Sequence, residues 1–373
     1  IGVTKVDPIK SGLYFERFIS KIRAKKTIVD GVTFLQGDLI PDCDLDLSYY
    51  RRNEVIEYVN NKFKGKTCKI CTFNTLSPKL LIKECGKIIA DKSEEEMTYV
   101  SGMIPKLHGV VEDLDKTYEL VPEFKEWCDE NRRVYDTALK LVSLNKNVSV
   151  HPSATLISYE NLEDSCPTQL SSDKEIVSSY SMDIVSAFCV KLDLLGLRCA
   201  DVINDVCKAL NIKMEDIDLS DPSIYLPFQN LKQAHGIFQV EQLSTLAAAQ
   251  KIKPKNLEEL SVVIAISRPG AMQFIDQYAS FTNTGSLESV HPFFDKILKG
   301  TGNLCIYQEN LMQALNLVGF TLDEAETCRK IVGKKLLDKV KEWEQKIKDK
   351  VKENNLHPEI GKILWTILNE SAS

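Results

Sequence analysis

The stretch LIPDCDLDLSYYRR, residues 39–52, sets three aspartates at every second position and then places two arginines after them. On a β-strand alternate side chains face the same way, so Asp42, Asp44 and Asp46 share one face while the intervening Cys and Leu residues point inward. Three neighbouring carboxylates repel one another unless a cation lies among them. Magnesium prefers such oxygen ligands, usually one or two carboxylates together with substrate phosphates. The row therefore indicates either a divalent metal site or a solvated edge strand whose charges discourage aggregation.

A second alternating stretch, VKLDLLGLR at residues 190–198, favours the metal site. Lys191 and Asp193 share one face of this predicted strand, and the apolar residues Val190, Leu192 and Leu194 share the other. Two adjacent strands with outward aspartates would hold two ions for in-line phosphoryl or nucleotidyl transfer. Lys191 would then pair with a substrate phosphate. The alternative for Lys191 and Asp193 is a same-face surface pair of little energetic consequence.

The remaining elements predict an α+β fold. A hairpin of two short strands is expected around Asp30-Gly31, and a helix is expected from about Ser48, its N-cap candidate. Residues 74–146 are polar and helical in pattern, and strand patterning returns with SATLISY at 153–159. The chain thus predicts a small sheet interrupted by a helical insertion and followed by a helical region.

Two helices of the last region have clear signatures. Thr321 and Glu324 stand at capping-box spacing at the start of TLDEAETCRKIVGKK, residues 321–335. The next segment, residues 336–355, carries an apolar stripe on a heavily charged helix. The stripe consists of Leu336, Val340, Trp343, Ile347 and Val351.

Composition narrows the class of protein. The chain has 373 residues, 43% of them hydrophobic and 27% charged, which is ordinary for a globular protein with two or three domains. It has no apolar run near the roughly 20 residues that span a bilayer, and no secretory signal opens it. Its net charge of −6 argues against a nucleic-acid coat, but not against a nucleic-acid enzyme with a local basic channel. Because the first residue is Ile, we expect a processed or excised piece of a longer chain.

Eleven cysteines without regular spacing indicate a reducing compartment. Cys68 and Cys71 form a Cys-x-x-Cys pair, but a structural zinc site needs a second ligand pair at matching spacing. We therefore interpret them as two small apolar residues of a buried strand rather than as a metal or redox pair.

Taken in order along almost the whole chain, several motifs resemble the catalytic core of the bacterial DNA polymerase III α subunit, a C-family polymerase of the DnaE type. The stretches that carry the resemblance are DPIKSGLYFERF (7–18), PDCDLDL (41–47), RRNEVIEYVNNKF (51–63), TFNTLSPKLLIKECGKII (72–89), HPSATLI (151–157), VKLDLLGLR (190–198), GIFQVEQ (236–242), ISRPGAM (266–272), IYQENLMQ (306–313) and GFTLDEAETCRKIVGKK (319–335). Single matches of this length are weak, whereas a full ordered series is specific.

The resemblance implies a small mixed-sheet, nucleotidyltransferase-like palm with a helical thumb insertion and helical fingers. The implied domains are palm at 1–73 and 147–198, thumb at 74–146, and fingers at 199–373, truncated at the carboxyl end. Catalytic, metal-binding aspartates would be Asp42, Asp44 and Asp193, holding two Mg²⁺ ions, with Asp46 in a supporting role. Residues that would meet the incoming triphosphate are Arg17, Lys191, Arg329 and Lys330.

Alternatives remain for the basic residues. Arg329 and Lys330 crowd a capped helix, where a triphosphate would offset their charge, or they belong to a solvated face. Lys79, Lys83 and Lys87 form a basic stripe at i, i+4 and i+8 that would follow duplex DNA, or they merely solvate the helix.

The function implied is template-directed DNA synthesis by two-metal nucleotidyl transfer from dNTPs to a primer 3′-hydroxyl, in the cytoplasm of a bacterial or phage-infected cell. Partners would be primer-template DNA, dNTPs and, beyond these, other polymerase fragments and replication accessory proteins, with no membrane. Family positions are altered at Asn74, at Pro152 to Ala154 and at Ala271, and nucleotide-binding segments of the family are missing at both ends. The alternative function is therefore a non-catalytic polymerase fragment that binds DNA or complementary polymerase polypeptides. A metal-dependent nuclease is a third, weaker alternative.

Overall fold

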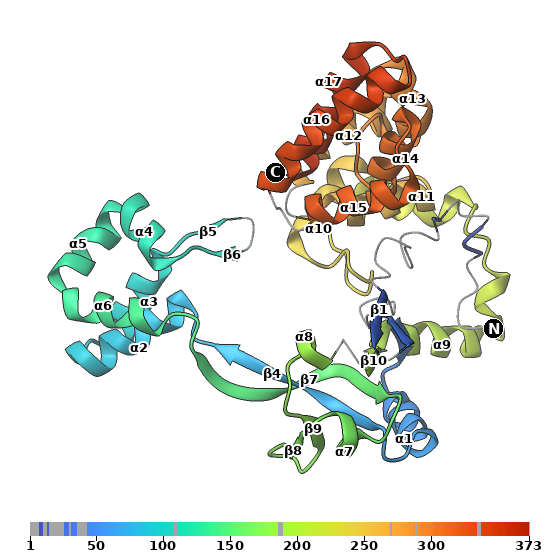
Figure 1. Cartoon of the computed structure of the whole chain (residues 1–373). Coiled ribbons are helices and arrows are strands. Elements are labelled where there is room, and N and C mark those ends of the chain that lie inside the picture. The colour runs from blue at the N-terminus through green and yellow to red at the C-terminus, as the bar shows by residue number, and fades with distance from the viewer. Residues whose placement is uncertain are drawn as a thin grey trace. The chain divides into compact units, whose positions relative to one another are not determined.

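The computed structural model describes residues 7–9, 13–14, 26–29, 31–35, 43–107, 110–185, 189–268, 271–287, 289–333 and 337–372. The chain divides into two compact units, Asp42–Leu197 and Ile1–Pro41 with Arg198–Ser373. We call them the sheet unit and the helical unit (Figure 1). The mixture of a sheet with many helices confirms the predicted α+β class.

The sheet unit is built on a sheet that has six strands within the described residues, in the order β3-β10-β7-β4-β9-β8. Strand β3 runs parallel to β10 and β4 runs parallel to β9, whereas the other neighbours are antiparallel. The sheet is therefore mixed, as predicted. The strands are β3 (Cys43–Ser48), β4 (Thr67–Thr75), β7 (Asn145–Ser158), β8 (Thr168–Leu170), β9 (Ile176–Ser178) and β10 (Cys189–Leu197).

Strand β7 is longer than its sequence pattern predicts. Alternation indicated residues 153–159, but the strand begins at Asn145 because its first half pairs with β4, from Thr75↔Asn145 to Cys71↔Val150. That half is mostly exposed and polar, with only Val148 and Val150 as alternating apolar residues, so its strand pattern is weak. The pairing leads into the helical insertion (Figure 1).

Helix α1 (Arg52–Lys62) follows β3, and its predicted start at Ser48 is wrong. Ser48 pairs with Leu197 as the last residue of β3, and its hydroxyl accepts the Arg51 N–H at 3.3 Å. Strand pairing therefore takes precedence over the helix cap at this position. One face of the helix is apolar and packs inward, since Val59 is buried and Val55 is half-buried.

A helical insertion between β4 and β7 has its own core. Its helices are α2 (Pro78–Ala90), α3 (Glu94–Gly102), α4 (Leu114–Leu120), α5 (Pro122–Glu130) and α6 (Arg132–Leu141). Ile82, Met97 and Phe124 are fully buried in that core. A two-stranded hairpin of β5 (Lys106–Leu107) and β6 (Val110–Val111) was not predicted. Two short helices, α7 (Leu162–Ser165) and α8 (Met182–Val185), flank the sheet strands that follow.

The helical unit begins with the predicted hairpin, β1 (Lys26–Val29) and β2 (Val32–Leu35). Its α-helices are α9 (Arg198–Leu210), α10 (Leu243–Ile252), α11 (Leu257–Ile266), α12 (Ile275–Thr284), α13 (Pro292–Leu298), α14 (Gln308–Val318), α15 (Leu322–Gly333), α16 (Leu337–Glu353) and α17 (Pro358–Ala372). The capping box at Thr321 is confirmed, because its hydroxyl accepts the Glu324 N–H at 3.2 Å and its N–H reaches the Glu324 carboxylate at 2.8 Å.

The apolar stripe of α16 is confirmed from Val340 to Val351, and these side chains enter a core shared with α14, α15 and α17. A second core lies among α10, α11 and α12. In the part of the chain that the structure describes, no helix combines the length and apolarity needed to cross a membrane.

Candidate functional site

Asp44 and Asp193 lie directly opposite each other on neighbouring parallel strands, β3 and β10. Aligned residues of adjacent strands project to the same face of a sheet, and such strands are about 4.8 Å apart. Two carboxylates held at this spacing repel each other unless a cation or a proton relieves the charge. The sheet therefore brings together two acidic side chains that are far apart in the sequence.

The carboxylate of Asp193 is only half satisfied. Its Oδ2 lies 2.7 Å from the Lys191 ammonium, and the two side chains are 13% and 15% exposed. Its Oδ1 is buried and has no hydrogen-bond partner among the residues that the structure describes. A buried acceptor without a donor costs about 1–3 kcal/mol, which a cation at this oxygen would remove.

The other two aspartates of the row are Asp46 and Asp42. Asp46 is exposed and aligns with Leu195 of β10 rather than with an acidic residue. Asp42 lies outside the described residues. Within the described ranges no three His, Cys, Asp or Glu side chains gather closely enough to hold a metal ion. The pair of Asp44 and Asp193 still fits Mg²⁺, which commonly takes one or two protein carboxylates and completes its shell with water and phosphate.

Arg52 joins β10, the strand that carries Asp193, to the neighbouring strand β7, a role that sequence reasoning missed. Its Nε donates to the carbonyl oxygen of Leu194 at 2.7 Å, and its Nη2 donates to the carbonyl oxygen of Pro152 in β7. Ala154, the β7 partner of Asp193, is anchored in turn because its N–H donates to His151 Nδ1 at 3.0 Å. Only the position of Arg52 directly after the aspartate row could have suggested this role.

The β7 segment that contains these residues is a bulge. The pairing with β4 passes from Lys69↔Thr155 to Cys71↔Val150, so extra residues of β7 stand opposite one residue of β4. Bulges bend a strand and re-aim its side chains, and they are common beside active sites. The altered family stretch HPSATLI therefore forms the irregular strand next to Asp193.

Arg329 is engaged by a carboxylate within the helical unit. Its Nε and Nη2 donate to the two carboxylate oxygens of Glu326 at 2.6 and 2.8 Å, and Glu326 is 1% exposed. Its Nη1 donates to Gln308 Oε1 at 2.8 Å, which joins α15 to α14. The hydrogen bond to Glu326 raises the pKa of Arg329 against the opposing effect of burial. Three of its five N–H groups are thus committed to structural contacts.

The other predicted triphosphate contacts remain predictions. Lys330 follows Arg329 on α15 and is half-buried. Arg17 lies outside the described residues. Lys191, which is also a predicted phosphate-binding residue, lies beside the predicted metal-binding residue Asp193, because its ammonium is 2.7 Å from that carboxylate.

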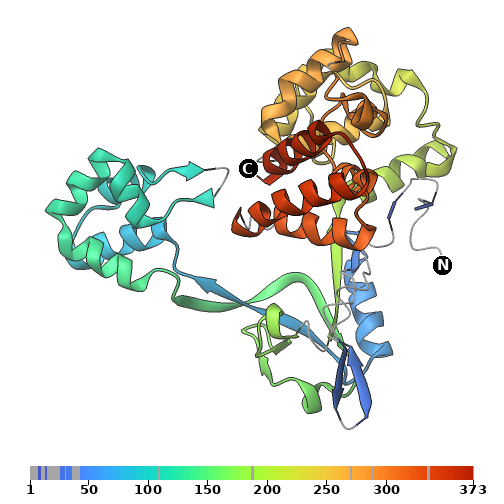
Figure 2. The same ribbon diagram turned by 45° about the horizontal axis from the view of Figure 1, so that its top comes forward.

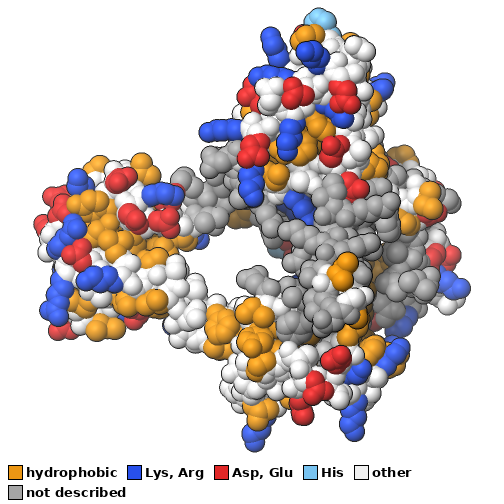
Figure 3. Space-filling view, viewed as in Figure 1, with side chains coloured by type: hydrophobic (Ala, Val, Ile, Leu, Met, Phe, Trp, Pro, Cys, Tyr) orange, Lys and Arg blue, Asp and Glu red, His pale blue; other side chains and the backbone are white. Residues whose placement is uncertain are grey.

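The predicted basic stripe of α2 is largely paired. Lys83 forms an ion pair with Glu94 of α3, and Lys87 contacts Glu84 at 2.8 Å and Glu94 at 3.2 Å. The hydrogen bond to Glu84, then that to Glu94, raises the pKa of Lys87. Figure 3 shows acidic and basic side chains intermixed over this insertion. These contacts favour the helix-solvation alternative for two of the three lysines, and Lys79 makes no ion pair with another described residue.

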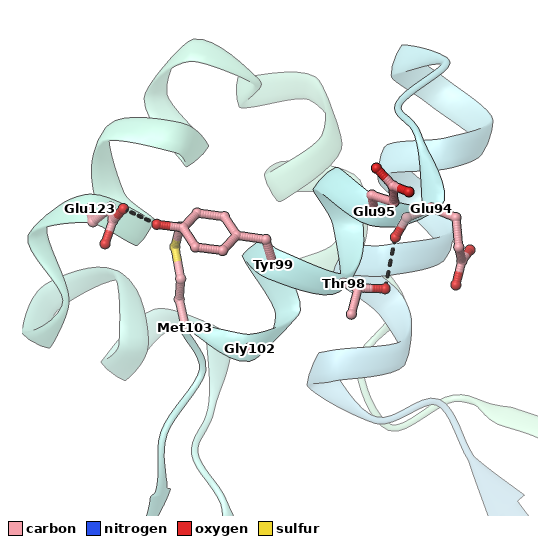
Figure 4. Close-up of a pocket in the computed structure, with 7 residues that line it drawn as sticks. All are labelled: Glu94, Glu95, Thr98, Tyr99, Gly102, Met103 and Glu123. Atoms are coloured by element: carbon pink, nitrogen blue, oxygen red, sulfur yellow. Dashed lines mark hydrogen bonds between the residues drawn. The ribbon is translucent and has the colours of Figure 1, made fainter.

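A cavity of about 690 Å³ opens on the insertion between α3 and α5 (Figure 4). Its lining residues are Glu94, Glu95, Thr98, Tyr99, Gly102, Met103 and Glu123. The Tyr99 hydroxyl donates to Glu123 Oε1 at 2.5 Å, and this carboxylate raises the pKa of Tyr99. An acidic rim repels phosphate, so this cavity is not suited to nucleotides or nucleic acid.

The cysteine pair of β4 behaves as predicted for buried apolar residues. Cys68 and Cys71 are both buried, and both belong to the set of free thiols. Burial raises the pKa of Cys68 to about 12 and raises that of Cys71 as well. Thiols with such pKa values stay protonated and unreactive near neutral pH.

Two families of known proteins match the chain, and together their matches cover nearly all of residues 1–355. The family described as "Bacterial DNA polymerase III alpha NTPase domain" matches residues 1–196, and "Bacterial DNA polymerase III alpha subunit finger domain" matches residues 198–355. Proteins named "DNA polymerase III subunit alpha" are similar over most of the chain. The one from Thermus aquaticus is 27% identical over 100% of this chain and 31% of its own length. The one from Campylobacter jejuni is 29% identical over 99% of this chain and 31% of its own length. The one from Helicobacter pylori is 30% identical over 90% of this chain and 28% of its own length. The chain spans about a third of the length of these relatives.

Proposed function

The chain belongs to the family of bacterial DNA polymerase III alpha subunits, and on this premise we propose that it is the catalytic core of a template-directed DNA polymerase. The proposed reaction transfers a nucleotidyl group from a dNTP to the 3′-hydroxyl of a primer paired with a template. The observation that carries the proposal is the alignment of Asp44 with Asp193, one oxygen of which is buried without a donor. In this proposal residues 1–73 and 147–198, which include β3, β4, β7 and β10, form the palm. Residues 74–146, with α2–α6, form the thumb, and residues 199–373 form the fingers.

Asp44 and Asp193 are the proposed metal ligands, joined by Asp42 as the family resemblance implies. Mg²⁺ at these carboxylates, two ions in the proposed mechanism, would supply positive charge beside the reacting phosphate and make the primer hydroxyl easier to deprotonate. The oxygen chemistry of the pair fits this ion. Asp46, aligned with Leu195, is proposed to support the site rather than to bind the metal.

Lys191 is proposed to exchange partners during substrate binding. In the structure its ammonium neutralises Asp193 at 2.7 Å. A triphosphate carries more negative charge than one carboxylate, so its arrival gives the ammonium a stronger partner at the same place. Arg52 would keep the backbone of β10 fixed while this exchange occurs, because it binds the carbonyl oxygen of Leu194.

The alternative function is a fragment that binds primer-template DNA or complementary polymerase polypeptides and gains activity only with them. One observation favours it: two N–H groups of the Arg329 guanidinium, a predicted triphosphate contact, are engaged by the Glu326 carboxylate.

Primer extension with magnesium tests the proposal. Asp44→Asn and Asp193→Asn are each expected to lower the extension rate by at least about 10²- to 10³-fold, the usual loss when one charge-stabilising group is removed. Asp46→Asn is the matched comparison, because it removes the same charge from the same strand two residues away, opposite Leu195, and it should lower the rate less than either of the other two substitutions. Extension by Asp193→Asn at the rate of the unsubstituted chain would refute the proposed site.

The same assay separates the two functions. Extension by the chain alone supports the enzyme. Extension that appears only after polypeptides covering the rest of the family's length are added supports the fragment. In the second case Asp44→Asn and Asp193→Asn should abolish the reconstituted activity as well.

A further inference from the structure

The last two helices of the helical unit, α16 and α17, lie side by side and enclose a groove of about 720 Å³. They are the two red helices near the C-terminus in Figure 2. The groove is lined by Glu344, Lys348, Val351, Lys352, Asn355, Leu356, Pro358, Gly361, Lys362, Trp365 and Thr366. All of these residues belong to the helical unit, whereas Asp44 and Asp193 belong to the sheet unit.

The floor of the groove is apolar. A Cβ at Gly361 would lie 3.2 Å from Val351 Cγ2, so α16 and α17 pack closely at this glycine. Trp365 is half-buried, because it packs against the hydrophobic core of the helical unit while it also lines the groove. The core contacts already restrict the ring in part, which lowers the side-chain entropy that a ligand must remove on binding.

The rim of the groove is basic, in a chain whose net charge is −6. Lys348, Lys352 and Lys362 line it, and Glu344 is the one carboxylate among the lining residues. Glu344 is itself paired with Lys348 at 2.6 Å. The groove thus complements a ligand that joins a flat apolar group to negative charge.

We propose that this groove binds single-stranded nucleic acid, with a base against Trp365 and backbone phosphates beside Lys352 and Lys362. Sequence-tolerant binding of single strands relies on this combination of an aromatic surface and a basic margin. A duplex keeps its bases stacked and cannot offer one to the ring. A peptide of acidic and apolar residues is the competing occupant, but a rim of two lysines around one aromatic ring matches the repeat of phosphate and base more closely.

The site goes beyond nucleotidyl transfer and needs neither Asp44 nor Asp193. Binding is expected to persist in Asp44→Asn and Asp193→Asn. Binding in the groove and the polymerase reaction are therefore tested independently. Either one can be disproved without disproving the other.

Tryptophan fluorescence of the full chain tests the proposal. Titration with a short oligothymidylate should quench emission, because a base stacks on Trp365. The chain has three tryptophans. Trp365→Phe should remove most of the quenching, whereas Trp127→Phe, which changes a half-buried tryptophan of the insertion, should retain it. Trp365→Ala should weaken binding about tenfold in a fluorescence-anisotropy assay with labelled oligothymidylate.

Salt dependence tests the two lysines. Each phosphate contact to a single strand contributes a slope of about −0.7 to a plot of log affinity against log salt, so Lys352→Gln with Lys362→Gln should reduce the slope by about 1.4. Lys339→Gln with Lys341→Gln removes the same charge from exposed positions of α16 outside the groove and should leave the slope unchanged.

Three results would overturn the proposal. The first is unchanged quenching in Trp365→Phe. The second is equal quenching by a blunt duplex of the same length. The third is quenching by a peptide of alternating Glu and Leu without quenching by oligothymidylate, which would assign the groove to an acidic partner protein instead.

Discussion

Lys191 and Asp193 form a local charge pair at the proposed metal site. Their 2.7 Å contact leaves one carboxylate oxygen of Asp193 buried and without a donor, while Asp44 stands opposite on the next strand. The ammonium therefore offsets part of the repulsion between two carboxylates. Substitution of Lys191 by a neutral residue would therefore weaken the binding of a phosphate ligand and increase the repulsion between Asp44 and Asp193.

Lys191→Met is expected to raise the KM for dNTP about tenfold or more while changing DNA affinity little, because a charge-assisted contact contributes about 1.5–3 kcal/mol. Steady-state kinetics and a separate DNA titration measure the two effects. Lys69→Met is the matched control, since Lys69 of β4 forms a similar ion pair with Glu175, at 2.6 Å. An equal rise in KM in both variants would show that the effect of Lys191 is only structural.

The reactivity of each thiol depends on its own burial. Burial raises the pKa of Cys128 and Cys328 to about 12 each, from an ordinary value of 9.0. Cys199, in contrast, is half-buried. Because the thiolate is the reactive form, only the more accessible thiols should react with alkylating agents while the chain is folded.

Iodoacetamide should label Cys199, which is only half-buried, and leave the buried Cys328 unlabelled in the folded chain, as mass spectrometry of digested protein would show. The free energy of unfolding should fall as pH rises from about 9 towards 12. In that window the unfolded chain releases thiol protons that the folded chain retains. Labelling of Cys328 at a rate equal to that of Cys199 in the folded chain would contradict the burial effect.

At the scale of elements, the pairing of β3 with β10 sets the geometry of the candidate site. The parallel register runs from Leu192↔Cys43 to Leu197↔Ser48, and α1 starts only after this pairing ends. Gly196 makes the transition possible. A Cβ there would lie 3.3 Å from Tyr49 Cα and 3.0 Å from Arg52 Cδ.

Gly196→Ala should therefore displace Arg52 from the carbonyl oxygen of Leu194 and destabilise the sheet unit by about 1–3 kcal/mol. Denaturant unfolding followed by circular dichroism measures the loss. Gly102→Ala is the control, because a Cβ at that helical glycine would meet no atom within 4 Å and should be neutral or slightly stabilising. Equal stability of the two variants would argue against the close packing at Gly196.

At the scale of the whole molecule, the two units have separate hydrophobic cores. Phe124 is fully buried in the insertion core of the sheet unit, and Leu364 is fully buried in the core of α14–α17. Units with independent cores need not unfold together. The chain is therefore expected to behave as more than one cooperative unit.

Differential scanning calorimetry should resolve at least two transitions. Phe124→Ala and Leu364→Ala, each costing about 2–5 kcal/mol, should lower the midpoint of different transitions. A single transition that shifts equally in both variants would show that the units are thermodynamically one.

The local pattern of the sequence determined much of this protein. Period-two alternation predicted the strands that hold Asp44 and Asp193, the capping box predicted the start of α15, and the apolar stripe predicted the buried face of α16. The ordered motifs identified the family. These features depend on neighbours within a few residues, so a sequence displays them directly.

Only the tertiary structure decided which distant residues meet. It set the register that aligns Asp44 with Asp193, joined Arg52 to β10 and β7, and extended β7 beyond its apolar half. It also paired Lys83 of α2 with Glu94 of α3 and joined Arg329 of α15 to Gln308 of α14. Each of these depends on strand pairing, hydrogen bonding or ion pairing between segments that packing brings together. A polar side chain can bond to any suitable partner within reach, and local periodicity does not specify that partner.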